Sequence, residues 1–238
     1  MSQNETKKKT FETDFHSHLL PDIDCSAPVD LSAELLNNMW NDGIRNVVLS
    51  PHFYPHWHNN VENFIEKRNA KIENLINRLK ENGLPYPELF PAAEVLLCPG
   101  LDKLEGLELL CIKGTRTLLI EMPDPSWSEA LLESLDDVRK LGYDIVVAHV
   151  DRYGKENAEM LINEGYAVQL NADSVCSFGK SRMCVDFAKR EYVFAVGSDT
   201  HVSSKGLPQY KKMCKAAGTL SNNLELINSR MLRLIGKN

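Results

Sequence analysis

The segment FETDFHS at residues 11–17 opens a series of seven short, largely apolar segments. Apolar runs of about four to eight residues are typical of strands that are buried on both faces of a sheet. The other segments of the series are 45–50, 88–94, 116–121, 144–149, 166–171 and 192–198. The series therefore predicts seven strands.

Amphipathic segments that predict helices lie between these strands. The clearest is 61–82, where apolar residues recur on one helical face and Gly83 follows as a stop signal. Further helices are expected near 30–42, 126–141, 155–164, 180–190, 205–216 and 221–236. Such alternation indicates an α/β protein with a parallel sheet covered by helices. Seven units favour a single-domain, TIM-like (β/α)7 barrel over an open doubly wound sheet, and no glycine-rich nucleotide-binding motif supports the open sheet.

Composition narrows the class of protein. The chain has 238 residues, a net charge of −6 and six cysteines. The negative charge argues against a nucleic-acid partner, and no apolar run is long enough to be inserted in a membrane. We expect a cytoplasmic protein with reduced thiols, in which residues 1–10 form a disordered tail before one domain over 11–238. The sequence predicts no oligomeric state.

Residues that bind metals are placed at the ends of the predicted strands. All seven histidines lie at or just beyond a strand end, as do three carboxylates. In a β/α barrel these ends converge on the face where active sites are built. The residues expected to meet there are His16, His18, His52, Glu94, Glu121, His149, Asp199 and His201. Alternatively, each histidine could be a hydrogen-bonding loop residue, and each acid could stabilise the start of a following helix.

The joint pattern favours a metal centre over these separate explanations. His16 and His18 point to the same side of a strand because side chains alternate with period two. Imidazole together with carboxylate suits Zn²⁺, Mn²⁺ or Fe²⁺. Eight candidate ligands exceed the three or four protein ligands of one catalytic zinc, so two or three ions that share carboxylates are expected. Such clusters activate water and position the oxygens of a phosphoryl transfer.

Several motifs occur in an order that resembles a known family. They are DFHSHLLPDID (14–24), SPHFYP (50–55), AAEV (92–95), LIEMP (119–123), AHVDRY (148–153), FGK (178–180) and GSDTH (197–201). Together they resemble the PHP (polymerase and histidinol phosphatase) superfamily. Within it, the chain is most similar to the bacterial manganese-dependent tyrosine-protein phosphatases of capsule and exopolysaccharide loci. The resemblance implies a distorted (β/α)7 barrel with three ions, usually manganese and sometimes iron or zinc.

The resemblance also implies roles for individual residues. His16 and His18 would bind one ion with Glu94 and Asp199. Glu94 would bridge to a second ion held by Glu121 and His149, and His52 and His201 would hold a third. Arg152 would grip the phosphoryl oxygens during attack by a metal-bound hydroxide, although it could instead pair with Asp151 at a helix start.

The sequence allows more than one role for the residues at two places. The family usually has Asp-Asp-Gly where this chain has Asp24-Cys25-Ser26. Either Cys25 is a thiolate ligand that favours a softer ion, or Asp24 reaches in, or the third site is weak. In the loop HFYPHWH (52–58), His56 and His58 could form a substrate rim, or the rings could pack on the helix that begins near 61.

The implied function is removal of phosphate from phosphotyrosine in a protein, by family resemblance the tail of a tyrosine kinase of polysaccharide export. A small-molecule phosphatase of histidinol-phosphatase type and a degenerate, non-catalytic binding barrel are the alternatives. A rival mechanism rests on Cys176 and Arg182, which have the Cys-x5-Arg spacing of cysteine-dependent tyrosine phosphatases. That loop contains one glycine and leaves the metal-type residues unexplained, so the metal mechanism is favoured.

Overall fold

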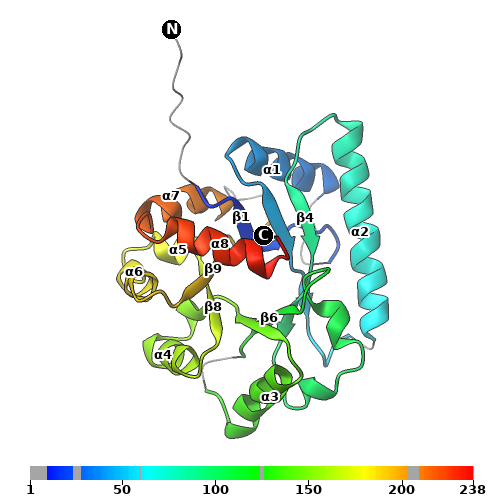
Figure 1. Cartoon of the computed structure of the whole chain (residues 1–238). Helices are drawn as coiled ribbons and strands as arrows, with labels where there is room; N and C mark the ends of the chain where they lie inside the picture. The colour runs from blue at the N-terminus through cyan, green and yellow to red at the C-terminus, as the bar shows by residue number, and fades with distance from the viewer. Residues whose placement is uncertain (1–9, 24–27, 59, 124–125, 203–208, 238) are drawn as a thin grey trace.

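The computed structural model describes residues 10–23, 28–58, 60–123, 126–202 and 209–237. Parallel strands lie at the centre and helices surround them (Figure 1). The strands are β1 Thr13–His18, β2 Asn46–Leu49, β3 His52–Phe53, β4 Glu88–Pro91, β5 Glu94–Leu96, β6 Thr117–Glu121, β7 Asp144–Val147, β8 Ala167–Asn171, β9 Val193–Gly197 and β10 Thr200–His201. Every one of the seven predicted strands is present.

One predicted strand, 88–94, is interrupted, and the predicted strands 45–50 and 192–198 are each followed by a short strand that was not predicted. The chain breaks between β2 and β3 at Ser50 and Pro51, and between β4 and β5 at Ala92 and Ala93. It breaks again between β9 and β10. The prediction of one continuous strand over 88–94 was therefore wrong, because the chain leaves one sheet after Pro91 and joins the other sheet at Glu94.

The breaks link two sheets into one barrel. One sheet has the order β10-β1-β2-β4 and the other has β3-β5-β6-β7-β8-β9, with all pairs parallel. Because each interrupted segment contributes to both sheets, the two sheets together form a ring of seven chain segments. Backbone hydrogen bonds continue beside the breaks, from Glu94 N to Pro51 O (3.0 Å) and from Asp199 N to His16 O (2.8 Å). The predicted distorted (β/α)7 barrel is confirmed.

The helices agree with the predicted series except at two places. They are α1 Val29–Asn41, α2 Val61–Glu81, α3 Glu129–Lys140, α4 Lys155–Asn163, α5 Ala172–Val175, α6 Ser181–Lys189, α7 Lys212–Thr219 and α8 Leu224–Leu234. The short α5 was not predicted, and α7 begins later than expected, with residues 203–208 outside the described part of the chain. The side chain of Asn60 caps α2 by accepting a hydrogen bond from Asn63 N (3.0 Å).

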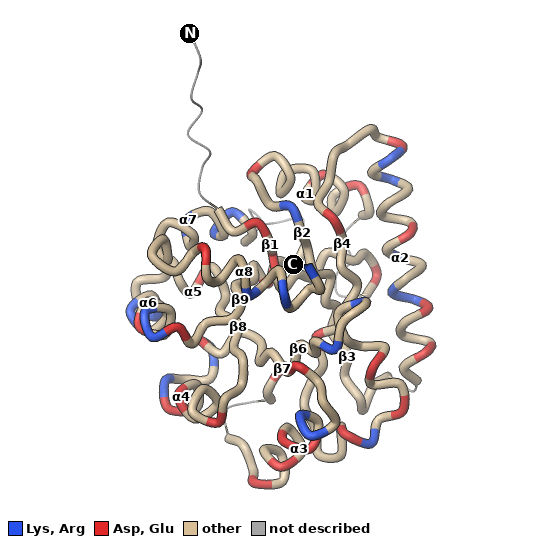
Figure 2. Tube along the Cα trace, viewed as in Figure 1, with Lys and Arg blue, Asp and Glu red and all other residues tan. Residues whose placement is uncertain are grey.

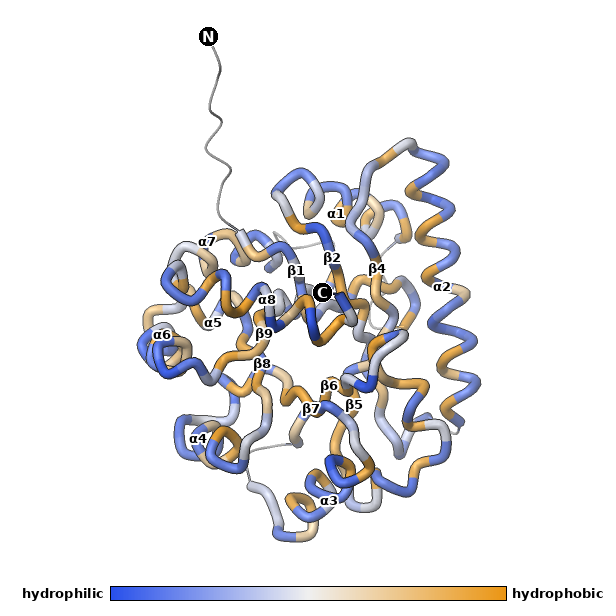
Figure 3. The backbone as a smooth tube through the Cα atoms, in the orientation of Figure 1, coloured by the Kyte–Doolittle hydropathy of each residue, from blue (hydrophilic) through white to orange (hydrophobic). Residues whose placement is uncertain are grey.

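The core and the two ends of the barrel are distinct. Strands β6 to β9 are largely hydrophobic, whereas both signs of charge are interspersed on the outer helices (Figures 3 and 2). Helix α8 covers the amino ends of the strands, where Arg230 donates to Val193 O (2.9 Å) and Thr117 donates to Leu234 O (2.7 Å). No helix in the described ranges has the length and apolar character needed to cross a bilayer. The opposite end, formed by the carboxyl ends of the strands, carries the predicted ligands.

The predicted tail at 1–10 lies outside the described residues except for Thr10. Thr10 is buried, and its hydroxyl lies 3.4 Å from the thiol of Cys214. Thr10 therefore packs against the rest of the chain.

Candidate metal centre

Strand register brings the ligands together. His18 of β1 is paired with His201 of β10, and His52 of β3 is paired with Glu94 of β5. His16 and His18 point to one side of β1, while Ser17 points away and donates to Val48 O (2.7 Å). Partners in adjacent parallel strands present their side chains to the same side of the sheet. The breaks after β2, β4 and β9 are followed by the short strands β3, β5 and β10, which carry His52, Glu94 and His201. Each of these residues lies beside another predicted ligand on the neighbouring strand.

Glu94 is the centre of the cluster. Its Oε2 lies 3.2 Å from His16 Nε2 and 3.3 Å from His18 Nε2. The same atom is 2.9 Å from His52 Nδ1, and the other oxygen, Oε1, is 2.8 Å from His149 Nε2. One fully buried carboxylate thus faces four imidazoles, as a carboxylate that bridges ions must.

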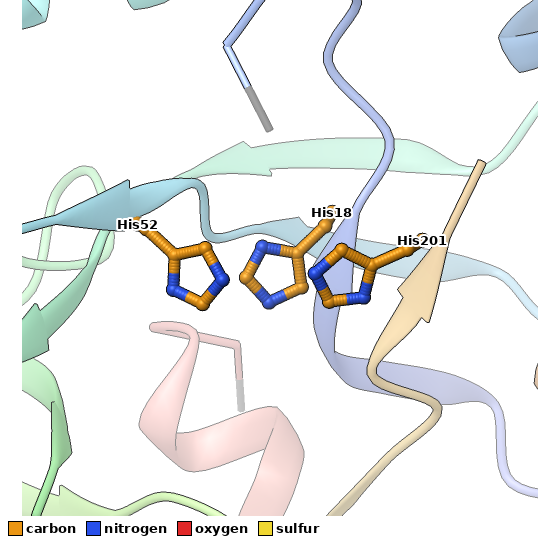
Figure 4. A group of neighbouring side chains, drawn as sticks. All are labelled: His18, His52 and His201. Carbon is orange, nitrogen blue, oxygen red and sulfur yellow. The ribbon is translucent and has the colours of Figure 1, made fainter. Parts of the chain in front are cut away.

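The remaining predicted ligands surround this centre. Asp199 Oδ1 lies 3.4 Å from His18 Nε2 and 3.7 Å from His201 Nδ1. Glu121 Oε1 lies 3.6 Å from His149 Nε2. Figure 4 shows His18, His52 and His201 side by side with their rings turned into a common space. Three overlapping groups each have ligand atoms within 4.8 Å of one another: His16, His18 and Glu94; His52, Glu94 and Glu121; and His18, His52 and His201.

Two of the predicted ligands have left-handed backbones. His149 has φ 30° and Asp199 has φ 50°, a region that L-residues other than glycine, asparagine and aspartate adopt at a cost. His149 lies two residues after the end of β7, and Asp199 lies two residues after the end of β9. Strain of this kind clusters at functional sites.

The hydrogen bonds of Gln169 show that the residues fit a cation. Gln169 Oε1 accepts from His149 N–H (2.7 Å), which can only donate, so the orientation of this amide is fixed. The same oxygen is 3.2 Å from His16 Nδ1, which must therefore carry the proton and donate. A neutral His16 then presents a lone pair on Nε2 toward Glu94 and toward His18 Nε2, 2.9 Å away. Either a proton or a metal ion must lie between such a lone pair and the carboxylate, and the convergence of several ring nitrogens on one carboxylate suits a metal ion.

The charges of the buried groups also indicate that the site fits a cation. Burial by itself raises the pKa of Glu94, but the charge of His16 and hydrogen bonds from His149 and His16 hold it well below its usual value. Burial also opposes ionisation of Asp199, yet the neighbouring histidines and Arg152 hold the pKa of Asp199 far below normal. Two ionised carboxylates thus lie in a buried pocket. The pKa of His16 is raised despite burial because Glu94 attracts its proton, and a metal ion would displace that proton on binding.

Arg152 is half-exposed at the mouth of the centre and forms an ion pair with Asp199. The alternative pairing with Asp151 is wrong, because the buried Asp151 accepts from Asn171 N–H (2.8 Å). The helix-capping explanations for the acids are wrong as well. Glu94 begins β5, Glu121 ends β6, and Asp199 is followed by β10.

The two rim histidines differ in their surroundings. The Nδ1 atom of His58 lies 3.0 Å from both the backbone nitrogen and the oxygen of Tyr54, and its ring contacts Phe53 and Phe64. His58 therefore packs on α2, as the alternative explanation expected, while one edge lines a cleft. His56 is exposed. Asp24 and Cys25 fall outside the described residues.

The Cys-x5-Arg segment lacks the structure of a phosphate-binding loop. Cys176 follows α5 and its thiol donates to Lys212 O at 3.7 Å, while Arg182 is exposed on α6. Backbone N–H groups of the segment bond within it, from Ser181 to Ser177 O (3.1 Å) for example. Burial raises the pKa of Cys176, the opposite of an activated thiolate.

Sequence reasoning missed the layer of residues behind the ligands. Gln169 donates to Asn171 Oδ1 (2.9 Å), and Asn171 donates to Asp199 Oδ2 (2.9 Å). Asp14 Oδ1 accepts from Ser198 N–H (2.7 Å) next to Asp199. The available signal was a polar residue within an apolar strand, as in YAVQLN at 166–171.

Comparisons with known proteins agree with this geometry. The chain is 28% identical over 203 residues to tyrosine-protein phosphatase YwqE of Bacillus subtilis, covering 79% of this chain and 76% of that protein. It is 26% identical to tyrosine-protein phosphatase CpsB of Streptococcus agalactiae, covering 92% and 97%.

Solved structures share the fold. A crystal structure from work on YwqE of Bacillus subtilis and CpsB of Streptococcus pneumoniae, described as unique metal-dependent tyrosine phosphatases, superposes with a TM-score of 0.73. The sequences are 21% identical, and the match covers 92% of this chain and 94% of that one. A lactonase from Listeria monocytogenes superposes with a TM-score of 0.54 at 10% identity, covering 97% and 92%.

A family model matches nearly the whole barrel. Residues 12–225 match the family described as capsular polysaccharide synthesis, CpsB/CapC. That span contains every predicted ligand and Arg152. On this match over most of its length, this chain, with its ring of seven chain segments and its histidine–carboxylate cluster, belongs to the CpsB/CapC family.

Proposed function

We propose that this chain hydrolyses phosphotyrosine in a protein by means of divalent metal ions held at the carboxyl end of the barrel. The observation that carries the proposal is the convergence of the predicted histidines and carboxylates around Glu94. The relatives named as tyrosine-protein phosphatases support the substrate class.

The ligands divide into overlapping sets. We assign His16, His18, Glu94 and Asp199 to one ion, Glu94, Glu121 and His149 to a second, and His52 and His201 to a third. The position of His52, 2.9 Å from Glu94, also allows it to serve the second ion. Mixed nitrogen and oxygen donors suit manganese, and also iron or zinc, and we propose manganese on the resemblance to the family.

The bound ions would supply Lewis-acid polarisation of the phosphoryl group and an activated water. The protein positions the substrate. His16 and His18 are fully buried, whereas the side chains of His201 and His52 are 44% and 25% exposed, so a phosphoryl group would approach on the side of these two residues. Arg152 pairs with Oδ2 of Asp199, whereas Oδ1 of Asp199 faces His18 and His201, so Asp199 can serve as a ligand while Arg152 stays beside the centre. The remaining N–H groups of the guanidinium would hold phosphoryl oxygens and stabilise the charge that develops on them.

The physiological substrate that we propose is the phosphorylated tail of a tyrosine kinase of polysaccharide export, in keeping with the family. A cytoplasmic location fits the free thiols of Cys98, Cys111, Cys176, Cys184 and Cys214, the cysteines that the structure describes.

Metal analysis combined with a phosphatase assay tests the proposal. The purified protein is expected to carry divalent metal and to release phosphate from a phosphotyrosine peptide. A chelator and His16→Ala should each abolish this activity, whereas the control Cys176→Ser should retain it. Equal activity on histidinol phosphate would instead support a small-molecule phosphatase. A folded protein without metal and without activity on either substrate would support a binding-only barrel.

A further inference from the structure

A cleft of about 490 Å³ opens beside the metal centre. Its lining includes His52, Tyr54, Trp57, His58, Phe64 and Lys67. His52 belongs both to this lining and to the ligand cluster, where it lies 2.9 Å from Glu94. The cleft is therefore continuous with the place where a phosphoryl group would be bound.

Aromatic rings lead from the metal centre to the surface along this cleft. The ring of His52 stacks on Tyr54 at 5.2 Å and 17°, and Tyr54 meets Trp57 edge to face at 4.8 Å. Trp57 is the outermost ring, with 76% of its surface exposed. A single exposed apolar side chain is common on a protein surface, so exposure alone assigns no role to Trp57.

The backbone around Trp57 distinguishes it from an incidental surface residue. Trp57 N–H donates to Tyr54 O (2.9 Å), and His58 N–H donates to the same oxygen (3.0 Å). The ring of His58 is held in turn between Phe53 and Phe64. The turn is thus fixed on both sides, and it presents an uncovered indole face at the rim of the cleft.

A positive charge lies on the α2 side of the same cleft. Lys67 is exposed and lines the cleft, and its charge acts on Asp22 only as a minor cause of the lowered pKa of that residue. The nearby Asp22 is already paired with Lys71 at 2.7 Å, and Lys71 is the main cause of its lowered pKa. The ammonium group of Lys67 is therefore available to an anionic ligand in the cleft.

We propose that this cleft is the peptide subsite of the phosphatase, with specificity for an aromatic phosphomonoester beside an acidic residue. The tyrosyl ring of the substrate would lie against Tyr54 and Trp57 while its phosphoryl group reaches the centre past His52. A carboxylate next to the phosphotyrosine in the substrate would pair with Lys67. The inference rests on the proposed function and adds the substrate features that this function leaves open.

The ring contact is tested with Trp57→Ala on two small substrates. The KM for p-nitrophenyl phosphate should rise about 3- to 10-fold, because an aromatic contact is lost, while kcat stays near wild type. The KM for the non-aromatic β-glycerophosphate should not change. Leu141→Ala, at an exposed leucine on the opposite end of the barrel, is the matched control. Equal effects of Trp57→Ala on both substrates, or none on either, would overturn the ring contact.

The charge contact is tested with Lys67→Glu on two phosphotyrosine peptides that differ only in neighbouring residues. The KM for a peptide with glutamates should rise about 3- to 5-fold, whereas the KM for the glutamine version should stay within twofold. Lys80→Glu, the same change near the other end of α2, should affect neither. Indistinguishable KM changes for both peptides would overturn the role of Lys67.

Two measurements separate failure of the subsite from failure of the function. Metal content and wild-type hydrolysis of the phosphotyrosine peptides are recorded for each preparation. Normal hydrolysis with KM values unchanged by either substitution refutes the subsite alone. A metal-loaded wild type that leaves both peptides intact refutes the proposed function and the subsite with it.

Discussion

Replacing Gln169 by leucine should weaken metal binding although Gln169 is not a ligand. The amide oxygen of Gln169 accepts from His149 N–H and from His16 Nδ1–H, and the residue is fully buried. Leucine has a similar volume but no acceptor, so two buried donors lose their partners. Each such loss costs about 1–3 kcal/mol, so the free energy of unfolding should fall by about 2–6 kcal/mol.

The effect on metal affinity follows from the tautomer. Without Gln169, the proton of His16 is no longer held on Nδ1, and a population with Nε2 protonated cannot bind the ion. Loss of comparable partners of ligating histidines reduces metal affinity about 10- to 100-fold. Gln169→Glu keeps the acceptor for both donors and should lose less affinity than Gln169→Leu.

The assay compares two free energies. Competition with a chromophoric chelator gives the affinity for Mn²⁺ or Zn²⁺, and urea unfolding of metal-free protein gives stability. Ser134→Ala is the matched control, because Ser134 is buried far from the centre and bonds Gly100 N–H and Cys98 O. It should reduce stability and leave metal affinity unchanged. Wild-type affinity in a folded Gln169→Leu protein would refute the reasoning, and nitrogen chemical shifts of the His16 ring provide a second check.

Three further predictions concern stability and thiol chemistry. Burial raises the folded-state pKa of Asp14 to about 6, so the metal-free wild type loses stability as the pH rises from 3.8 to 6. Over this range the free energy of unfolding of Asp14→Asn should rise by about 3 kcal/mol relative to wild type. Urea unfolding at several pH values measures this difference, and a difference that does not depend on pH would contradict the prediction. Gly197→Ala should unfold at lower temperature and bind metal poorly, because the new Cβ would lie 2.5 Å from the Cβ of His16, whereas Gly179→Ala has open space and should melt like wild type. Alkylation of Cys176 by iodoacetamide should be slow at pH 7, accelerate only above pH 9 and leave activity intact, since burial raises the pKa of this thiol; inactivation in step with alkylation would revive the cysteine mechanism.

The sequence predicts the strands and their ligands because both depend on local features. An apolar run ends at a polar residue, and parallel strands bring such ends together, so the meeting of His16 with Glu94 and Asp199 follows from position along the chain. The same logic explains why the strand pairs His18–His201 and His52–Glu94 lie side by side.

Other features depend on contacts between distant segments and leave little local trace. The bend at Ala92 and Ala93 lies inside an apolar segment, so one strand was predicted where two short strands exist. Gln169 is a polar residue in an apolar strand, and its role appears only when His16, 153 positions away, is placed against it. Lys67 can bind an anionic ligand because Asp22 is already paired with Lys71, and these two residues are far apart in the sequence.

The left-handed backbones of His149 and Asp199 determine how an inactive but intact enzyme should be made. Alanine at either position would remove the ligand and also favour a different turn, so the end of the barrel would rearrange and the loss of function would have two causes. Asparagine tolerates this conformation. Asp199→Asn therefore removes the negative charge while the turn after β9 and the entrance to the cleft keep their shape. Such a variant should bind a phosphoprotein substrate without cleaving it, and it could therefore be used to isolate the physiological partner.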